Sequence, residues 1–127
     1  MELCLDTSAI IRLKKDPQLL TKIAHKEDIL LITKITEYEL LVGSFFYGKK
    51  ERRFVEKILT TLIVVSVEEY IPLAAKITAD LMKLGKKIND FDVLIAATCL
   101  GRNMKIVTSN SHFDEIKKVY PLDVIKV

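Results

Sequence analysis

The sequence predicts an α/β protein, a three-layer sandwich in which helices flank a mostly parallel central sheet. Short runs rich in Val, Ile and Leu alternate with longer segments whose apolar residues recur at helical spacing. The short runs are almost continuously apolar, which is typical of parallel strands covered by helices on both faces. The chain has 127 residues and no internal repeat or linker, so we expect a single domain over residues 1–127.

Five segments have the length and the composition that are typical of strands. They are residues 2–6 (ELCLD), 28–33 (DILLIT), 63–67 (IVVSV), 105–109 (KIVTS) and 122–127 (LDVIKV). Because helical segments separate most of these strands along the chain, we expect them to pair mostly in parallel.

Four helices are predicted in the first half of the chain. One begins at about Thr7, and a second begins near Pro17, because proline suits the first turn of a helix. Thr36 and Glu39 match the capping-box spacing, which predicts a third helix through the apolar run that follows. The fourth covers residues 49–62 (KKERRFVEKILTTL).

Two further helices are predicted in the second half. Residues 68–85 have the pattern of a long amphipathic helix that ends at Gly85. The next helix, over residues 90–101, is capped by Asn89 or Asp90. It is apolar on all sides (VLIAATCL), so we expect it to be buried, although two aspartates stand at its start.

Polar side chains from distant parts of the chain are expected at one edge of the predicted sheet. In an open parallel sheet, ligands bind outside the carboxyl ends of the strands. Asp6 lies at the carboxyl end of the first strand, and Glu39 lies in the first turn of the helix entered soon after the second strand. Asn110 directly follows the strand at residues 105–109. All three side chains therefore reach the same edge.

The helix over residues 90–101 adds two carboxylates to this edge. It leads into the strand at residues 105–109 and should run antiparallel to it, so its first turn lies where that strand ends. Asp90 and Asp92 stand in this first turn. A buried helix that begins with acids is thereby explained, because its start emerges where a carboxylate is hydrated or bound to a cation.

A hard divalent cation fits this set of oxygen donors. Several carboxylates in one place repel one another unless they are protonated or neutralised. With carboxylates and no set of Cys and His ligands, the fitting ion is Mg²⁺ or Mn²⁺. His25 and His112 lack the spacing of metal ligands, so neither is expected to bind the ion.

Each of these side chains also has a purely structural interpretation. Asp6 could cap the helix that follows it, and Glu39 could complete a capping box. The two aspartates of the helix at residues 90–101 could complement its dipole, and Asn110 is an ordinary turn residue. The convergence of all these positions at one edge favours a site.

The composition is that of a soluble globular protein, with 50% hydrophobic and 29% charged residues. The net charge of +3 permits an anionic partner without requiring one. The start of the chain lacks the basic head of a signal peptide, and no apolar run approaches the ~20 residues of a membrane span. Cys4 and Cys99 are expected to be buried free thiols. We therefore expect a cytoplasmic protein with no membrane association.

Four segments of the chain resemble the motifs of the PIN-domain ribonucleases, and in particular of the VapC-type toxins. The opening strand and first acid correspond to LDTSAII (5–11), and the second motif, an acid before an apolar pair and a glycine, to EYELLVG (37–43). The third motif, an acid directly before an apolar run, corresponds to FDVLIAA (91–97), and the last motif to IVTSNSHFDEI (106–116). The motifs follow in order over nearly the whole chain.

The resemblance selects among the acids and implies their role. It selects Glu39 over Glu37 and Asp92 over Asp90. It implies that Asp6, Glu39 and Asp92 hold Mg²⁺ or Mn²⁺ for the hydrolysis of RNA, with products that carry a 5′-phosphate and a 3′-hydroxyl. Neighbouring hydroxyl groups either hydrogen-bond these acids or serve as caps and turn residues: Thr7, Ser8 and Thr108.

One position departs from the family pattern. The fourth position, often an acid in the family, is Asn110, which has a carbonyl oxygen but no charge. We expect Asn110 to be an auxiliary ligand or to position the attacking water. Asp114 is a candidate substitute ligand, and Asp90 a candidate lesser ligand. Because one charge is missing, the alternative function is a catalytically weak or inactive PIN-like module that binds RNA or protein.

The expected partners are RNA, a cognate antitoxin protein and a second copy of the chain. Cations near the acids must hold phosphates, and the candidates are Arg12, Lys83, Lys86, Lys87 and the segment KKERR (49–53). The usual alternative is a solvated helix face. The resemblance suggests that the aromatic segment SFFYG (44–48) joins a homodimer or receives an antitoxin peptide. The antitoxin would occupy the cleft and silence the nuclease.

Overall fold

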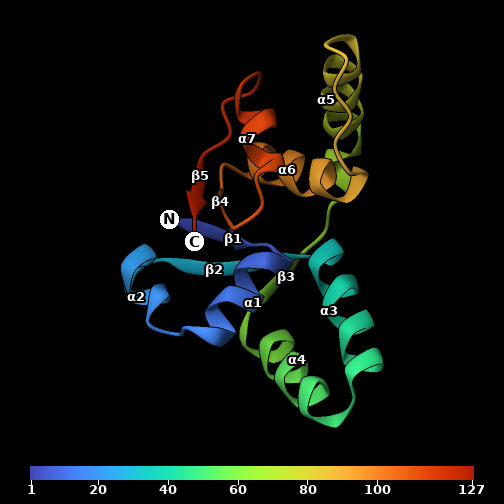
Figure 1. Ribbon diagram of the computed structural model, residues 1–127. Helices are drawn as coiled ribbons and strands as arrows, with labels where there is room; N and C mark the ends of the chain where they lie inside the picture. The colour runs from blue at the N-terminus through green and yellow to red at the C-terminus, as the bar shows by residue number, and fades with distance from the viewer.

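Five parallel strands form the central sheet of the computed structural model, which describes residues 1–127 (Figure 1). They lie in the order β3-β2-β1-β4-β5, so that β1 is the central strand. Their bounds are Glu2–Leu5 (β1), Ile29–Thr33 (β2), Ile63–Val65 (β3), Lys105–Thr108 (β4) and Val124–Lys126 (β5). All five predicted strands are confirmed, and every pairing is parallel.

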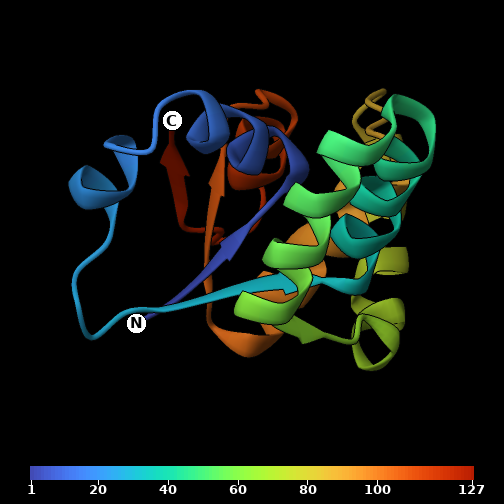
Figure 2. The same cartoon turned by 90° about the horizontal axis from the view of Figure 1, so that it is seen from below.

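Helices cover both faces of the sheet, as the predicted three-layer sandwich requires (Figures 1 and 2). On one face lie α1 (Thr7–Lys15), α2 (Leu19–Ile23), α3 (Lys34–Tyr47) and α4 (Lys49–Thr61). On the other lie α5 (Ile71–Lys83), α6 (Asp90–Arg102) and α7 (His112–Lys117). A 3₁₀ turn at Glu68–Tyr70 replaces the expected first turn of α5. None of the helices has the length and apolar character needed to cross a membrane.

The sheet has a separate hydrophobic core on each face. Side chains alternate along a strand, so Leu3 and Leu5 of β1 pack with Ile10 of α1 and Val55 of α4 on one face. Cys4 points to the opposite face, where it joins the core that includes most of the buried residues of α6. Strands with two buried faces explain the almost continuously apolar runs in the sequence.

Helix α6 is buried, as its apolar sequence predicts. Its residues Val93 and Ile95–Cys99 are nearly inaccessible to solvent, and Asn89 caps its start by accepting from the backbone N–H of Phe91 at 2.9 Å. Near its end the helix contains Gly101, which packs against the Tyr70 ring. A Cβ at this position would lie only 2.2 Å from the ring. Glycine there allows the close approach of Tyr70.

The capping box predicted from Thr36 and Glu39 is wrong. Helix α3 begins at Lys34, and its N-cap is Thr33, whose side chain accepts from the backbone N–H of Thr36. Thr33 is also the last residue of β2, so the strand passes directly into the helix. Thr36 is buried within the helix. The Glu39 carboxylate is therefore not used as a cap and is available to the site.

Candidate active site

Asp6 lies at the carboxyl end of the central strand β1 and is buried, with 4% of its surface exposed. Its Oδ1 accepts hydrogen bonds from the backbone N–H of Ala9 at 2.8 Å and from the Ser8 hydroxyl at 2.7 Å. Its Oδ2 accepts from the Thr108 hydroxyl. Asp6 therefore caps α1 and also stands at the predicted edge, so its capping role does not remove it from the candidate site.

A hydroxyl network joins the ends of β1 and β4. Besides its bond to Asp6, Thr108 accepts from the backbone N–H of Asn110 at 2.9 Å and lies 3.2 Å from the Ser8 hydroxyl. Ser8 accepts in turn from the backbone N–H of Ser109 at 3.0 Å. The predicted contacts of Ser8 and Thr108 with an acid are thus present, and they hold Asp6 in one orientation.

Glu39 reaches the same edge from α3. Its Oε1 accepts from the Thr7 hydroxyl at 2.8 Å, so α1 holds this carboxylate and buries it in part. Glu37, two residues earlier, points elsewhere and pairs with Lys34 at 3.3 Å. The choice of Glu39 over Glu37 therefore agrees with the direction of the two side chains.

Asp92 reaches the edge from the first turn of α6, as the antiparallel placement of that helix predicts. Its side chain is 17% exposed, and its Oδ2 lies 2.9 Å from Nδ1 of His112 and 3.5 Å from Nδ2 of Asn110. Asp90 in the same turn is exposed and makes no side-chain hydrogen bond or ion pair. No pattern in the sequence indicated the contact with His112, which lies within the last motif and begins α7.

The amide of Asn110 is already engaged on both sides. Its Oδ1 accepts from the backbone N–H of His112 at 2.9 Å, and its Nδ2 faces Asp92. Asp114, the candidate substitute ligand, pairs with Lys126 at 2.9 Å instead. Lys126 also donates to the backbone carbonyl of Asn110 at 2.9 Å. Asn110 thus contacts Asp92 of the candidate site, whereas Asp114 is paired with Lys126.

The three acids influence one another electrostatically. Burial raises the pKa of Asp6, hydrogen bonds from Thr108, Ser8 and Ala9 oppose that rise, and the charge of Asp92 adds to it. Burial also raises the pKa of Glu39, against the hydrogen bond from Thr7, and the charges of Asp92 and Asp6 add to the rise. Neither Asp6 nor Glu39 has an ion-pair partner. Of the three acids, only Asp92 has a basic partner, the imidazole of His112.

The donor set fits a hydrated hard cation. No three His, Cys, Asp or Glu side chains are close enough together to enclose an ion by themselves. Mg²⁺ does not require such a cage, because it keeps several waters and binds through one or two carboxylates. The negative charges of these carboxylates repel one another and raise the pKa of Asp6 and of Glu39. A bound divalent cation would reduce this repulsion. The residues present thus suit Mg²⁺ or Mn²⁺ held partly through water.

The cations expected near the acids differ in their freedom to bind a phosphate. Lys86 pairs with Glu115 at 2.6 Å. Arg12 on α1, Lys83 and Lys87 are exposed and take part in no ion pair. Arg52, within the segment 49–53, lies over the ring of Phe45 at 6.0 Å. Arg12 stands on the helix that Asp6 caps, which places a free guanidinium on an element of the site.

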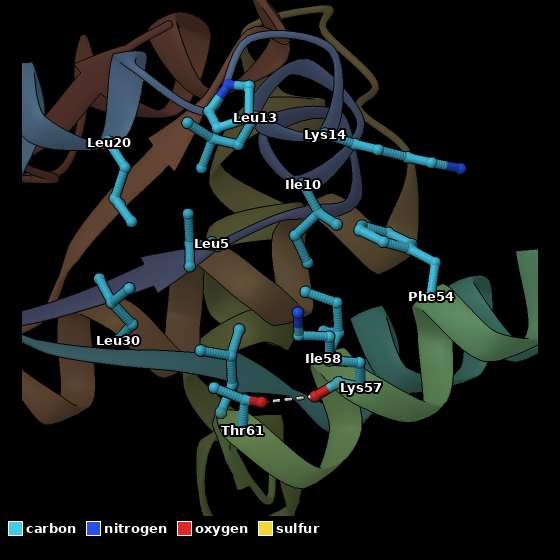
Figure 3. A pocket seen from close by; sticks show the side chains of 12 residues that line it. Leu5, Ile10, Leu13, Lys14, Leu20, Leu30, Phe54, Lys57, Ile58 and Thr61 are labelled. Carbon is cyan, nitrogen blue, oxygen red and sulfur yellow. Dashed lines mark hydrogen bonds between the residues drawn. The ribbon is translucent and has the colours of Figure 1, made fainter.

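An apolar cavity of about 510 Å³ opens on the α1 face of the sheet (Figure 3). Side chains from α1, α2, α4 and the sheet line it, including Leu5, Leu13, Leu20, Phe54 and Ile58. Leu5 directly precedes Asp6, so the cavity adjoins the strand that carries the first acid. A second apolar surface is the aromatic tip of α3, where Phe45, Phe46 and Tyr47 are each about three-quarters exposed.

Comparison with known proteins gives a family match over almost the whole chain. The family model described as the PIN domain matches residues 3–119. A protein of Rickettsia bellii (strain RML369-C) named "Ribonuclease VapC" is 34% identical over 134 residues, a match that covers 100% of this chain and 97% of the relative.

Solved structures share the fold. VapBC-1 from nontypeable Haemophilus influenzae has a chain that matches with a TM-score of 0.83 and 27% identity, covering 99% of this chain and 98% of that chain. VapBC-5 from Mycobacterium tuberculosis, described as a member of the VapBC family of toxin-antitoxin systems, matches with a TM-score of 0.71 and 20% identity, covering 99% and 98%. At the lower identity the likeness concerns the fold alone.

Proposed function

The chain belongs to the PIN-domain family, and on that premise we propose that it is a metal-dependent endoribonuclease and the toxin of a toxin–antitoxin pair. We propose further that residues 1–127 form a single nuclease domain. The observation that carries the proposal is the convergence of Asp6, Glu39 and Asp92 at the carboxyl edge of one parallel sheet, each on a different element. The relative in Rickettsia bellii that is named a ribonuclease supports the type of reaction.

The residues of the chain divide the chemistry between them. Asp6, Glu39 and Asp92 would hold the cation, some directly and some through water. A bound Mg²⁺ or Mn²⁺ supplies positive charge to the scissile phosphate and lowers the pKa of a water molecule. The Thr108 hydroxyl holds the carboxylate of Asp6. The Thr7 hydroxyl holds that of Glu39.

Asn110 is proposed to help position the attacking water or to act as an auxiliary ligand. Its amide N–H group already faces Asp92, whereas its carbonyl oxygen accepts from the backbone of His112. Positioning through the amide thus keeps the present hydrogen bonds, and ligation through Oδ1 would have to break one of them. The missing fourth charge is consistent with a site that holds few ligands directly, as Mg²⁺ prefers.

RNA is the proposed substrate because phosphodiesters are anionic and the accessible cations are unpaired. Exposed Arg12, Lys83 and Lys87 offer positive charge without an acidic partner, and the net charge of the chain is +3. Neutralising phosphates by such side chains releases counterions, so binding should weaken as salt is raised.

Removal of the metal is expected to abolish cleavage. The purified protein is incubated with several single-stranded and structured RNAs in Mn²⁺ or Mg²⁺, and matched samples contain EDTA. We expect products with a 5′-phosphate and a 3′-hydroxyl in the metal-containing samples, and none with EDTA. Retention of RNA without products under either ion would favour the binding module instead, and cleavage that continues in EDTA would contradict a metal-dependent site.

The proposed antitoxin occupies the apolar cavity between α1, α2 and α4. An open cavity of about 510 Å³ lined by leucine, isoleucine and phenylalanine side chains exposes apolar surface that a partner segment would bury. Leu5, the residue before Asp6, is part of the cavity's lining, so a segment lodged there would contact the strand that carries the first acid. A partner that extends from this cavity past the end of β1 would cover Asp6 and block the site, as an antitoxin must.

The second copy of the chain is proposed to pack on the aromatic tip of α3. Phe45 and Phe46 are 75% and 77% exposed, which is unusual for adjacent aromatic side chains on a monomer.

Both free cysteines are buried and unpaired, which suits the reducing cytoplasm that we propose as the location.

Two phenylalanine-to-alanine variants separate these partner surfaces. The protein is co-expressed with a candidate antitoxin protein, and complex formation and dimerisation are measured by light scattering. Phe54→Ala, in the cavity, is expected to weaken complex formation by about tenfold or more, whereas Phe46→Ala should weaken only dimerisation. Loss of the complex in Phe46→Ala and not in Phe54→Ala would assign the antitoxin to the aromatic tip.

A further inference from the structure

His112 makes the shortest side-chain contact with Asp92. Its Nδ1 lies 2.9 Å from Oδ2 of the carboxylate, and the histidine side chain is 53% exposed. An ionised carboxylate has no hydrogen to give, so Nδ1 must carry the hydrogen in this bond. The other oxygen of Asp92, Oδ1, has no hydrogen-bond partner in the protein.

The backbone around His112 is tied to the same network as Asp6. The backbone N–H of His112 donates to Oδ1 of Asn110, and the backbone N–H of Asn110 donates to Thr108, which donates to Asp6. Lys126 holds the carbonyl of Asn110 from β5. The imidazole therefore approaches Asp92 from a turn anchored to two strands.

From this geometry we propose that His112 is a positioning residue for Asp92, holding Oδ2 so that Oδ1 is presented to the divalent cation. The inference rests on the proposed function, since it assigns Asp92 to the metal site. Ligating carboxylates are commonly held by hydrogen bonds to their second oxygen, and loss of such a partner costs about 10–100-fold in metal affinity. The amide of Asn110 donates to the same oxygen at 3.5 Å, which is a longer and weaker hydrogen bond than the one from the imidazole at 2.9 Å.

The simplest alternative is an exposed pair of side chains with no effect on the site, because surface ion pairs contribute little on average. The positioning role and this alternative predict different results when the donor at the place of Nδ1 is changed. A positioning role depends on a hydrogen-bond donor at the place of Nδ1 and not on the imidazole as such. Asparagine offers its Nδ2 at nearly that place, whereas alanine offers no donor.

The test measures binding of Mn²⁺ alone, by the loss of the electron paramagnetic resonance signal of free Mn²⁺. Wild type is compared with His112→Ala, His112→Asn and, as a control, His25→Ala at the only other histidine in the chain. We expect His112→Ala to weaken Mn²⁺ binding by about 10-fold or more, and His112→Asn to stay within about threefold of wild type. The His25→Ala variant should bind as wild type does.

Each outcome has a distinct meaning. Wild-type affinity in His112→Ala, or tighter binding, overturns the positioning role while the metal site stands. Equal loss in the alanine and asparagine variants overturns it as well, because the donor would not be what matters. Wild type that binds no Mn²⁺ overturns the metal site of the proposed function and this inference with it. Circular dichroism confirms that the variants are folded.

Nuclear magnetic resonance of the two imidazole rings gives a second readout without metal. We expect the His112 ring to carry its hydrogen on Nδ1 and to lose that preference in Asp92→Asn. An imidazole that carries its hydrogen only on Nε2 in wild type would contradict the bond on which the inference depends.

Discussion

Replacing Asp6 with asparagine is expected to lower RNA cleavage by about 10³-fold or more while the protein remains folded. Asp6 is the most central of the three acids, since it ends the middle strand and feels the charge of Asp92. Asparagine can keep the bonds from Ala9 and Ser8 through Oδ1, and its amide can donate to Thr108. The loss would therefore report the missing charge and not a broken cap.

The same variant is expected to be at least as stable as wild type at neutral pH without metal. Burial raises the pKa of Asp6 in the folded protein, so the folded state holds the proton more tightly than the unfolded chain does. That contribution to stability is present below the unfolded pKa and is lost as pH rises through the raised folded pKa. Asparagine carries no charge to bury. As pH rises over this range, the midpoint of thermal unfolding of Asp6→Asn should therefore fall less than that of wild type.

A matched control for Asp6→Asn is Asp16→Asn, at the other end of the same helix. Asp16 is the C-cap of α1, and its side chain makes no hydrogen bond. We expect cleavage by Asp16→Asn to match wild type in a fluorescent RNA assay. Substantial cleavage by Asp6→Asn would remove this carboxylate from the proposed chemistry.

Asp92→Asn and Asp90→Asn are expected to differ by about 10²-fold or more in cleavage, although both remove one charge from the first turn of α6. Of these two aspartates, only Asp92 raises the pKa of Asp6 and of Glu39, and only Asp92 contacts His112. Asp90 is exposed and is expected to be replaceable with little loss.

The comparison of these two variants separates metal chemistry from the helix dipole. The dipole responds to any acid in the first turn, at about 0.3–1 kcal/mol for each, so the two variants would lose similar stability on that account. Cleavage is measured at equal protein and metal concentrations for both. Equal losses of activity would show that Asp92 acts through the dipole and would contradict its role as a ligand.

The position of the acids could be predicted from the sequence because it follows from topology. Parallel strands end at one edge, so Asp6 after β1 and Asn110 after β4 had to lie near each other once the strands were recognised. Helix α6 returns to β4, which brings Asp92 to the same place. For Asp6 the cap and the proposed site do not exclude each other, since Oδ1 caps α1 while Oδ2 faces Thr108 at the end of β4.

The errors arose where local spacing fits more than one arrangement. Thr33 and Thr36 each precede a polar residue by three positions, and no local pattern showed that β2, which ends at Thr33 as predicted, passes directly into α3. The pairing of Asp92 with His112 joins residues 20 apart on two helices, and no local pattern reports such a contact. Asp114 was a candidate ligand by proximity in sequence, but the fold gives it Lys126 from β5 as a partner.

The most direct measurement is the anomalous diffraction of Mn²⁺ soaked into crystals of the wild-type protein. Our account predicts one or two strong peaks at the carboxyl edge of the sheet, bonded to oxygens of Asp6, Glu39 and Asp92 or to waters that they hold. Crystals saturated with Mn²⁺ that show no peak among these three side chains, or peaks only elsewhere on the surface, would contradict it.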